Sequence, residues 1–439
     1  MALANQRHTP IDAALFTSNR ARLAAKLQPG SLVVVQANDV MPTNADGVMP
    51  FHQNSDLRYL TGIAQEETIL LLYVGAAGQA PRSILFLKKT SPAIALWEGH
   101  KYTAQEAQTC SGIEEVHELA AFPQLLHQLM GQAEYVYLPT NEHSRASVAL
   151  PTRDLRFVKT CQERYPLHRY RRLAPLMQAL RTIKAAEEIA LLRRACAITG
   201  EGLQALIQQV RPGVMEYALE AELIHTYTRQ GADGFAYTPI VASGANTCVL
   251  HYTANSRACQ AGALLLVDAG ARYAGYCADM TRTLPVSGRF TARQKQVYQA
   301  VLAVMKHAQS LLVAGQGNLH SYHEAVGRCM EEQLLQLGLL STQEVRNQDP
   351  QHPAYKRYFM HGTSHYLGLE THDVGDFHRT FEAGMVVTVE PGIYIAEEGL
   401  GIRLENVMVL HEDGVEDLTA HVPLEPEAIE EAMHPTASG

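Results

Sequence analysis

The sequence predicts two folded parts, an α/β domain over residues 1–175 and an α+β domain over residues 176–439. Short apolar runs alternate with helical patterns in the first part, whereas strand-like runs interrupted by a few long helices fill the second. Between them lies the basic stretch 164–184, where the pattern becomes helical. A chain of 439 residues fits two domains of ordinary size.

The first part contains four short runs rich in Leu or β-branched residues, SLVVVQA, TILLLYV, SILFLKK and YVYLP, which are typical of buried strands. Helical periodicity over 11–28 ends at Pro29-Gly30, a strong stop signal. Further helical patterns lie near 103–109 and 119–132. This alternation predicts an α/β domain with a largely parallel sheet.

The second part begins with a long helical pattern over 185–210, which Arg211-Pro212-Gly213 ends. Another helix runs to about residue 230. Strand-like segments then dominate, separated by helices near 292–313 and 321–338. The order of elements predicts an α+β domain.

Composition excludes several classes of function. The net charge of -9 argues against nucleic acid as the main partner, because phosphate binding needs a basic face. No long apolar run predicts a membrane span, and the start MALANQRHTPIDAALF lacks the pattern of a signal peptide. Seven cysteines with no C-x-x-C pair favour reduced thiols. We therefore expect a cytoplasmic protein that binds neither membrane nor nucleic acid.

Chemistry is first indicated by LLLVDAGARYAGYCADMTRTL, where a buried run ends in Asp268 and a second run contains Asp279. If the two runs pair as a hairpin, with Gly270 and Gly275 in the turn, the two carboxylates lie side by side. Adjacent carboxylates repel each other in an apolar setting, and a metal ion removes that cost. Alternatively both are ordinary turn residues with backbone partners.

Three further segments favour the metal. HGTSHYLGLETHDVG places His361, His365 and His372 within a glycine-rich loop. MVVTVEPGIYI is a buried strand that ends in Glu390, and GIRLENVMVL places Glu405 in the middle of an apolar strand. Four acids and one imidazole suit harder divalent ions, Mn²⁺ first, with Co²⁺ or Zn²⁺ as alternatives.

The order Asp268, Asp279, His365, Glu390, Glu405 resembles the ligand set of the pita-bread metallopeptidases, the family of methionine aminopeptidase, prolidase and aminopeptidase P. The resemblance covers nearly the whole chain and is closest to bacterial aminopeptidase P. FHQNSDLRYLTG, VLHYTAN, HGTSHYLGL and VEPGIYI carry it beside the hairpin. It implies a creatinase-like N-terminal α/β domain and a pita-bread catalytic domain.

The resemblance also implies roles for single residues. Two metal ions would be held by Asp268, Asp279, His365, Glu390 and Glu405, and a hydroxide bridging them would attack the peptide bond. Glu390 would also take a proton from the attacking water. His251, His361 and His372 would stabilise the tetrahedral intermediate, and Arg403 would orient a ligand or the substrate. The implied cleft residues are Tyr237, Tyr394 and, from a neighbouring subunit, Trp97; for Trp97 a core aromatic is an equal reading.

The implied activity is release of the first residue from peptides with proline at position two, by a homodimer or homotetramer. A prolidase restricted to Xaa-Pro dipeptides has the same site residues, so that alternative stays open. The segment between His372 and Glu390 looks shorter than in close relatives, which leaves the fine substrate preference open. A non-enzymatic peptide-binding module is disfavoured because all five ligands are present, and the same residues disfavour metal-free creatinase-like chemistry.

Overall fold

The structure is a computed structural model that describes residues 7–146 and 149–434, and its chain forms two compact units. The N-terminal unit extends to Arg181, and the C-terminal unit begins at Thr182. The boundary near residue 175 expected from the sequence lies inside α7 (Ala174–Arg181), shortly before this division, and stays a prediction. No helix among the described residues is long and apolar enough to cross a membrane.

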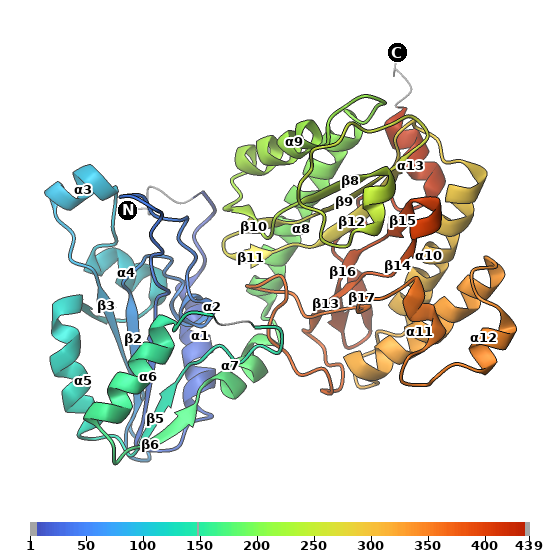
Figure 1. Cartoon of the computed structure of the whole chain (residues 1–439). Helices are drawn as coiled ribbons and strands as arrows, with labels where there is room; N and C mark the ends of the chain where they lie inside the picture. The colour runs from blue at the N-terminus through green and yellow to red at the C-terminus, as the bar shows by residue number, and fades with distance from the viewer. Residues whose placement is uncertain (1–6, 147–148, 435–439) are drawn as a thin grey trace. The chain divides into compact units, whose positions relative to one another are not determined.

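The N-terminal unit is built on a six-stranded sheet of order β4-β3-β2-β1-β5-β6 (Figure 1). Its strands are β1 (Ser31–Gln36), β2 (Ile69–Val74), β3 (Arg82–Leu87), β4 (Glu115–Glu118), β5 (Tyr135–Leu138) and β6 (Arg169–Arg172). The prediction of a largely parallel sheet is wrong for its centre. β2 runs antiparallel to both β1 and β3, whereas β1–β5, β5–β6 and β3–β4 are parallel. The short connection from β2 to β3 explains the antiparallel pairing of these two strands, because a parallel pair needs a longer crossover.

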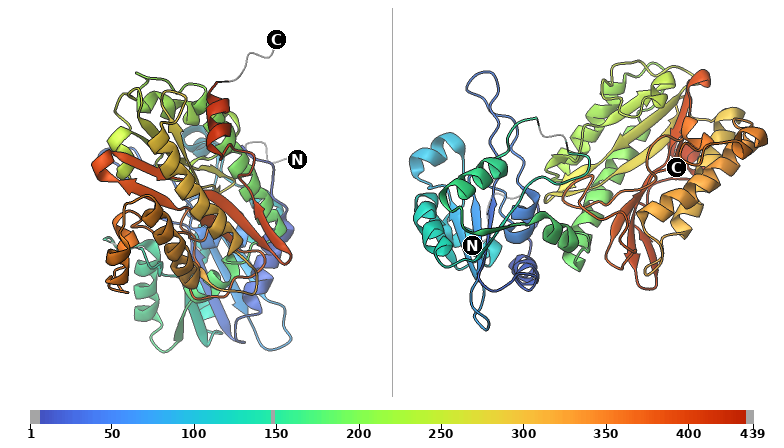
Figure 2. Two further views of the ribbon diagram at one scale, coloured as in Figure 1. Left: turned by 90° about the vertical axis from the view of Figure 1, so that its right-hand side faces the viewer. Right: turned by 60° about the horizontal axis from the view of Figure 1, so that its bottom comes forward.

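Both faces of this sheet are covered. Leu32 and Val34 of β1 pack in one core with residues of α5 and α6, and the intervening Val33 and Val35 are also buried. Figure 2 shows helices flanking the strands of this unit. The helices are α1 (Ala13–Ala24), α2 (Ser55–Thr61), α3 (Pro92–Glu98), α4 (Ala104–Ser111), α5 (Phe122–Met130) and α6 (Arg153–Arg164).

The C-terminal unit contains small antiparallel sheets against which two helix pairs pack. The sheets have the orders β12-β9-β8, β13-β16-β17, β14-β15 and β11-β10-β7. α8 and α9 contact the strands of the first half, and α10 contacts β13, β14 and β15 of the second half (Figures 1 and 2). One continuous hydrophobic core joins all four long helices to these strands. This agrees with the predicted α+β pita-bread architecture.

The strands of this unit are β7 (Gly234–Phe235), β8 (Ile240–Ser243), β9 (Leu264–Ala269), β10 (Ala271–Tyr273), β11 (Tyr276–Cys277), β12 (Met280–Pro285), β13 (Val386–Val389), β14 (Gly392–Ile395), β15 (Leu400–Arg403), β16 (Asn406–His411) and β17 (Gly414–Asp417). The helices are α8 (Ala186–Ile207), α9 (Glu216–Arg229), α10 (Ala292–Ser310), α11 (Leu319–Gln336), α12 (Thr342–Arg346) and α13 (Pro426–Met433).

Candidate metal centre and active site

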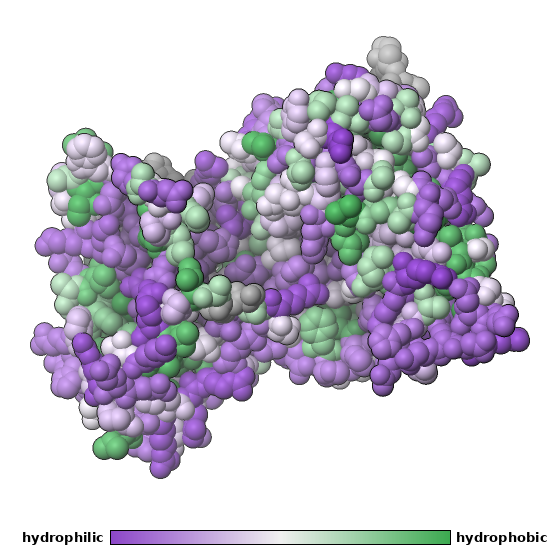
Figure 3. Space-filling model, in the orientation of Figure 1, coloured by the Kyte–Doolittle hydropathy of each residue, from purple (hydrophilic) through white to green (hydrophobic). Residues whose placement is uncertain are grey.

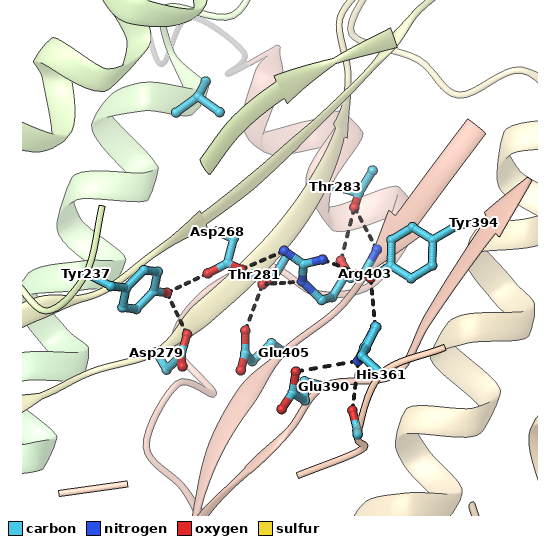
Figure 4. A network of polar contacts seen from close by, with 12 residues as sticks. Tyr237, Asp268, Asp279, Thr281, Thr283, His361, Glu390, Tyr394, Arg403 and Glu405 are labelled. Atoms are coloured by element: carbon cyan, nitrogen blue, oxygen red, sulfur yellow. Dashed lines mark hydrogen bonds and ion pairs between the residues drawn. The ribbon is translucent and has the colours of Figure 1, made fainter. Parts of the chain in front are cut away.

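Asp268 and Asp279 come together at Tyr237. Asp268 lies on β9 and Asp279 directly precedes β12, which pairs with β9 so that Thr281 stands opposite Asp268. The Tyr237 hydroxyl lies within hydrogen-bond distance of both carboxylates (Figure 4). A phenol has one proton to donate, so it can satisfy one carboxylate at a time. The pair therefore has more acceptors than donors, which suits a cation.

A glycine makes this approach possible. A Cβ placed on Gly270 would lie 1.9 Å from the carbonyl oxygen of Ala278, the residue before Asp279. Contacts below about 3.0 Å do not occur for real Cβ atoms. The two segments that carry the aspartates can therefore come this close only because position 270 has no side chain.

Glu405 joins the pair through Thr281. The sequence prediction that Glu405 lies in the middle of a strand is wrong: it occupies a break between β15 and β16. Its backbone N–H donates to the Thr281 carbonyl oxygen at 3.1 Å, and the Thr281 hydroxyl donates to the Glu405 carboxylate at 2.7 Å. These bonds tie Glu405 to β12 in place of regular strand pairing, and its carboxylate lies in one group with Asp279 and His365.

His365 is held with its Nε2 toward the acids. Its Nδ1 lies 2.9 Å from the Tyr366 carbonyl oxygen, which can only accept, so Nδ1 carries the proton. Nε2 lies 3.4 Å from Asp279 Oδ2 and 3.6 Å from Glu390 Oε1. The loop is fixed to β13, since the His365 N–H donates to the Thr388 hydroxyl and the Glu390 N–H to the Thr363 carbonyl oxygen.

These residues form a donor set that fits divalent metal ions. Donor atoms of Asp279, His365 and Glu405 all lie within 4.8 Å of one another, and all three residues are buried. Asp268 reaches the group through the Tyr237 hydroxyl, and Glu390 reaches it through His365. Oxygen donors with one imidazole are the chemistry expected for Mn²⁺ and similar ions.

The charges of the acids support the same fit. Burial raises the pKa of Glu390 to about 7, against the lowering effect of His365. Burial and the charges of Asp279 and Glu390 raise the pKa of Glu405 well above its ordinary value. Burial also raises the pKa of Asp268, although Arg403 opposes it. Carboxylates that are this costly to ionise together are stabilised by a bound cation.

A chain of hydrogen bonds connects the acids to His361. Arg403 of β15 donates through Nη2 to Asp268 Oδ2 at 2.6 Å and through Nη1 to the Tyr394 hydroxyl at 2.8 Å. That hydroxyl lies 2.8 Å from His361 Nε2 (Figure 4). The order Asp268, Arg403, Tyr394, His361 places a fixed positive charge between an acid and a histidine.

Of the three histidines assigned to the cleft, His361 lies beside Glu390 and His372 lies beside His365. His361 Nδ1 lies 2.8 Å from the Gly362 carbonyl oxygen and 3.7 Å from Glu390 Oε2. Burial, reinforced by the charge of Arg403, lowers the pKa of His361 to about 3, so its ring is neutral at neutral pH. His372 is exposed, and its ring centroid lies 4.5 Å from that of His365. His251 is also exposed, and its charge contributes to the lowered pKa of His361.

Trp97 belongs to the N-terminal unit, whereas the residues above belong to the C-terminal unit. It is 86% exposed on α3, a helix with no buried residue, so its reading as a core aromatic is wrong. A role in a neighbouring subunit's cleft stays a prediction.

Several residues that hold the ligands in place could not be identified from the sequence. Thr281 hydrogen-bonds Glu405 and Arg403, Thr388 holds the His365 loop, and a buried Lys184–Asp373 ion pair lies beside His372 in the chain. One signal was available: Thr281 and Thr283 recur at two-residue spacing in a fully buried strand, where hydroxyls need partners.

The fold and the buried acids with one histidine define a pita-bread metallopeptidase, a hydrolase that uses divalent metal ions. The chain belongs to metallopeptidase family M24, whose family model matches residues 190–412, and the model of the aminopeptidase P N-terminal domain matches residues 16–137. Both observations confirm the predicted family and fold.

Two similar proteins and one solved structure show the extent of the likeness. The Xaa-Pro aminopeptidase of Escherichia coli (strain K12) is 36% identical over 436 residues, which cover 95% of this chain and 97% of that protein. The Xaa-Pro aminopeptidase of Haemophilus influenzae is 33% identical, with coverage of 95% and 97%. The structure of zinc-substituted E. coli aminopeptidase P in complex with product has a TM-score of 0.87 and 34% identity, with coverage of 97% and 99%.

Proposed function

We propose that this chain is an Xaa-Pro aminopeptidase, which releases the first residue from peptides with proline at position two. The observation that carries the proposal is the cluster of four carboxylates and one imidazole, in which Glu390 is partly exposed and the other four residues are buried. It stands on a fold that matches aminopeptidase P over nearly the full length of both chains.

We further propose that the site holds two divalent ions, with Mn²⁺ as the first candidate and Co²⁺ or Zn²⁺ as alternatives. Asp268, Asp279, His365, Glu390 and Glu405 would bind them. When bound, such ions polarise a carbonyl oxygen and make water a nucleophile at neutral pH.

The chain's own side chains would then transfer the proton and bind the substrate. Glu390 Oε2 lies toward His361, where it can take a proton from the attacking water. His251 and His372 reach solvent and can donate to the oxygen of the tetrahedral intermediate. In this structure both ring nitrogens of His361 have partners, so His361 must exchange one bond to reach the substrate.

Proline specificity has a chemical reason. The bond before proline is a tertiary amide with no N–H, and the ring restricts its shape. A peptidase that recognises substrate through backbone N–H groups loses that contact at proline. Metal chemistry in a cleft shaped for the ring does not depend on it.

The experiment compares three peptides with the Mn²⁺-loaded protein: Arg-Pro-Pro, Gly-Pro and Arg-Ala-Ala. We expect release of arginine from Arg-Pro-Pro and little cleavage of the other two. Cleavage of Gly-Pro alone would make the protein a prolidase. Cleavage of none, together with no uptake of Mn²⁺ by the metal-free protein, would make it a peptide-binding module.

We also propose a homodimer or homotetramer. Leu96 and Trp97 of α3 are 80% and 86% exposed, and Figure 3 shows hydrophobic surface over this helix. Exposed apolar groups of this size favour an interface. Because Trp97 is the sole tryptophan, its fluorescence should shift to shorter wavelength as the protein associates. An emission maximum that stays at the long wavelength of an exposed tryptophan at all concentrations would contradict burial of Trp97 in the oligomer.

A further inference from the structure

The structure contains a buried ion pair that the metal centre does not use directly. Lys184 Nζ lies 3.3 Å from Asp373 Oδ2, and each side chain is 1% exposed. Lys184 precedes α8, whereas Asp373 follows His372 in the loop that also carries His365. A buried ion pair does not by itself stabilise a fold much better than apolar residues would, so another role is worth seeking.

The pair has two short connections to the histidines. Asp373 follows His372 directly in the chain, and its N–H donates to the Tyr366 carbonyl oxygen at 2.9 Å. The same carbonyl accepts the Nδ1 proton of His365, also at 2.9 Å. One oxygen therefore fixes both the backbone behind His372 and the tautomer of His365.

Lys184 is itself held in place. Its N–H donates to the Gly384 carbonyl oxygen at 2.8 Å, and the neighbouring Ile183 forms a β-bridge with Met385, just before β13. The backbone at Lys184 is thus fixed to the segment just before β13, the strand that directly precedes Glu390.

The space around the pair is also closed. A Cβ on Gly368 would lie 2.2 Å from Asp373 Oδ2 and 3.1 Å from Lys184 Cε. Any side chain at position 368 would therefore displace the Asp373 carboxylate. Gly368 does not have a positive φ angle, so alanine there strains no backbone.

We propose that Lys184 and Asp373 are positioning residues that keep His372 against the His365 ring and keep His365 Nε2 turned toward Asp279 and Glu390. They touch neither substrate nor metal and act through the Tyr366 carbonyl and the loop backbone. The expected effect on kcat rests on the proposed function, whereas the expected effect on Mn²⁺ affinity does not.

The test uses two variants of the full chain. Gly368→Ala keeps both charges but displaces Asp373, and Asp373→Asn keeps the shape but removes the ion pair. Gly202→Ala is the matched control, because its Cβ would crowd Tyr227 at 2.6 Å between α8 and α9, away from the loop. Circular dichroism checks that each protein is folded, and Asp373→Asn decides the matter if Gly368→Ala does not fold.

Two readouts are measured, Mn²⁺ affinity by competition with a chelator and kcat on Arg-Pro-Pro at saturating Mn²⁺. We expect Mn²⁺ binding to weaken at least tenfold, as for changes in groups that orient metal-binding histidines, and kcat to fall roughly tenfold or more. The control should change neither.

Folded variants with wild-type Mn²⁺ affinity and kcat would overturn the proposal, as would an equal loss in the control. If the wild-type protein cleaves no Xaa-Pro peptide, the proposed function fails. The Mn²⁺ affinities would then still decide whether Lys184 and Asp373 position His365.

Discussion

Arg403 donates a hydrogen bond of 2.6 Å to Asp268 while its other terminal nitrogen donates to the Tyr394 hydroxyl. All three groups are buried. The guanidinium therefore neutralises one side of Asp268 and fixes a tyrosine that contacts His361. The planar guanidinium holds its donors in a rigid fork that reaches both partners at once, whereas the ammonium of a lysine is a compact charge without that fixed geometry.

Replacement of Arg403 by lysine should therefore lower kcat/KM on Arg-Pro-Pro by about tenfold to a hundredfold, because the loss displaces Tyr394 and, through it, His361. Steady-state kinetics at saturating Mn²⁺ measures this. The surface change Arg193→Lys, which alters an exposed pair with Glu416, is the control and should have no effect. Wild-type kcat/KM in Arg403→Lys would show that the fork is dispensable.

Tyr237→Phe should destabilise the metal-free protein more than the Mn²⁺-loaded protein. The change removes the hydroxyl near both Asp268 and Asp279, and buried acceptors left without a donor cost about 1–3 kcal/mol. In the loaded protein a bound cation stabilises the two carboxylates in place of the lost hydroxyl. Urea unfolding with and without Mn²⁺ measures the difference, and an equal loss in both states would contradict it.

Asp279→Asn and His361→Ala should separate metal binding from chemistry. Asp279 belongs to the buried donor group, so its amide variant should lose metal and activity together. His361 contacts Tyr394 and Glu390 from outside that group, so His361→Ala should keep its metal and lower kcat. Metal analysis and kinetics on the same samples test both. Normal turnover in Asp279→Asn, or metal loss in His361→Ala, would show that the assignment is wrong.

The pH dependence of stability should differ between the metal-free and loaded forms. Burial raises the pKa of Glu390 to about 7 and raises that of Glu405 and Asp268 as well. A carboxyl whose pKa is higher in the folded state than in the unfolded state destabilises the fold once it ionises. These groups therefore make the metal-free protein less stable as pH rises from about 4.5 to 7.

Bound Mn²⁺ should reduce that loss, because it stabilises the ionised acids. Thermal unfolding across this pH range, with and without Mn²⁺, measures the two slopes. Parallel curves for the two forms would be incompatible with a cation at these acids.

The sequence was sufficient for the features that follow from local pattern. The runs that form β1, β2, β3 and β5 were predicted as strands, and α8, α10 and α11 as helices, because continuous apolar runs and helical periodicity mark them. β4 (EVHE) and β6 (RYRR) were missed, since edge strands made of charged residues carry no apolar signal.

In the candidate site, too, some residues could be predicted from local sequence pattern and others could not. Asp268 and Glu390 could be found because each acid directly follows a run of buried strand residues, Asp268 near the end of β9 and Glu390 just after β13. The break at Glu405 could not be found, because it depends on hydrogen bonds to Thr281, which is distant in sequence. The Lys184–Asp373 pair could not be predicted for the same reason, because its two residues are distant in the sequence. The exposure of Trp97 could not be predicted either, because it depends on how α3 packs.

The central claim, that five residues from separate segments hold two metal ions, is tested most directly by anomalous diffraction. Crystals of the Mn²⁺-loaded protein, measured on both sides of the manganese absorption edge, should show two peaks among Asp268, Asp279, His365, Glu390 and Glu405. A well-ordered, Mn²⁺-saturated crystal with no peak among these residues would contradict the claim.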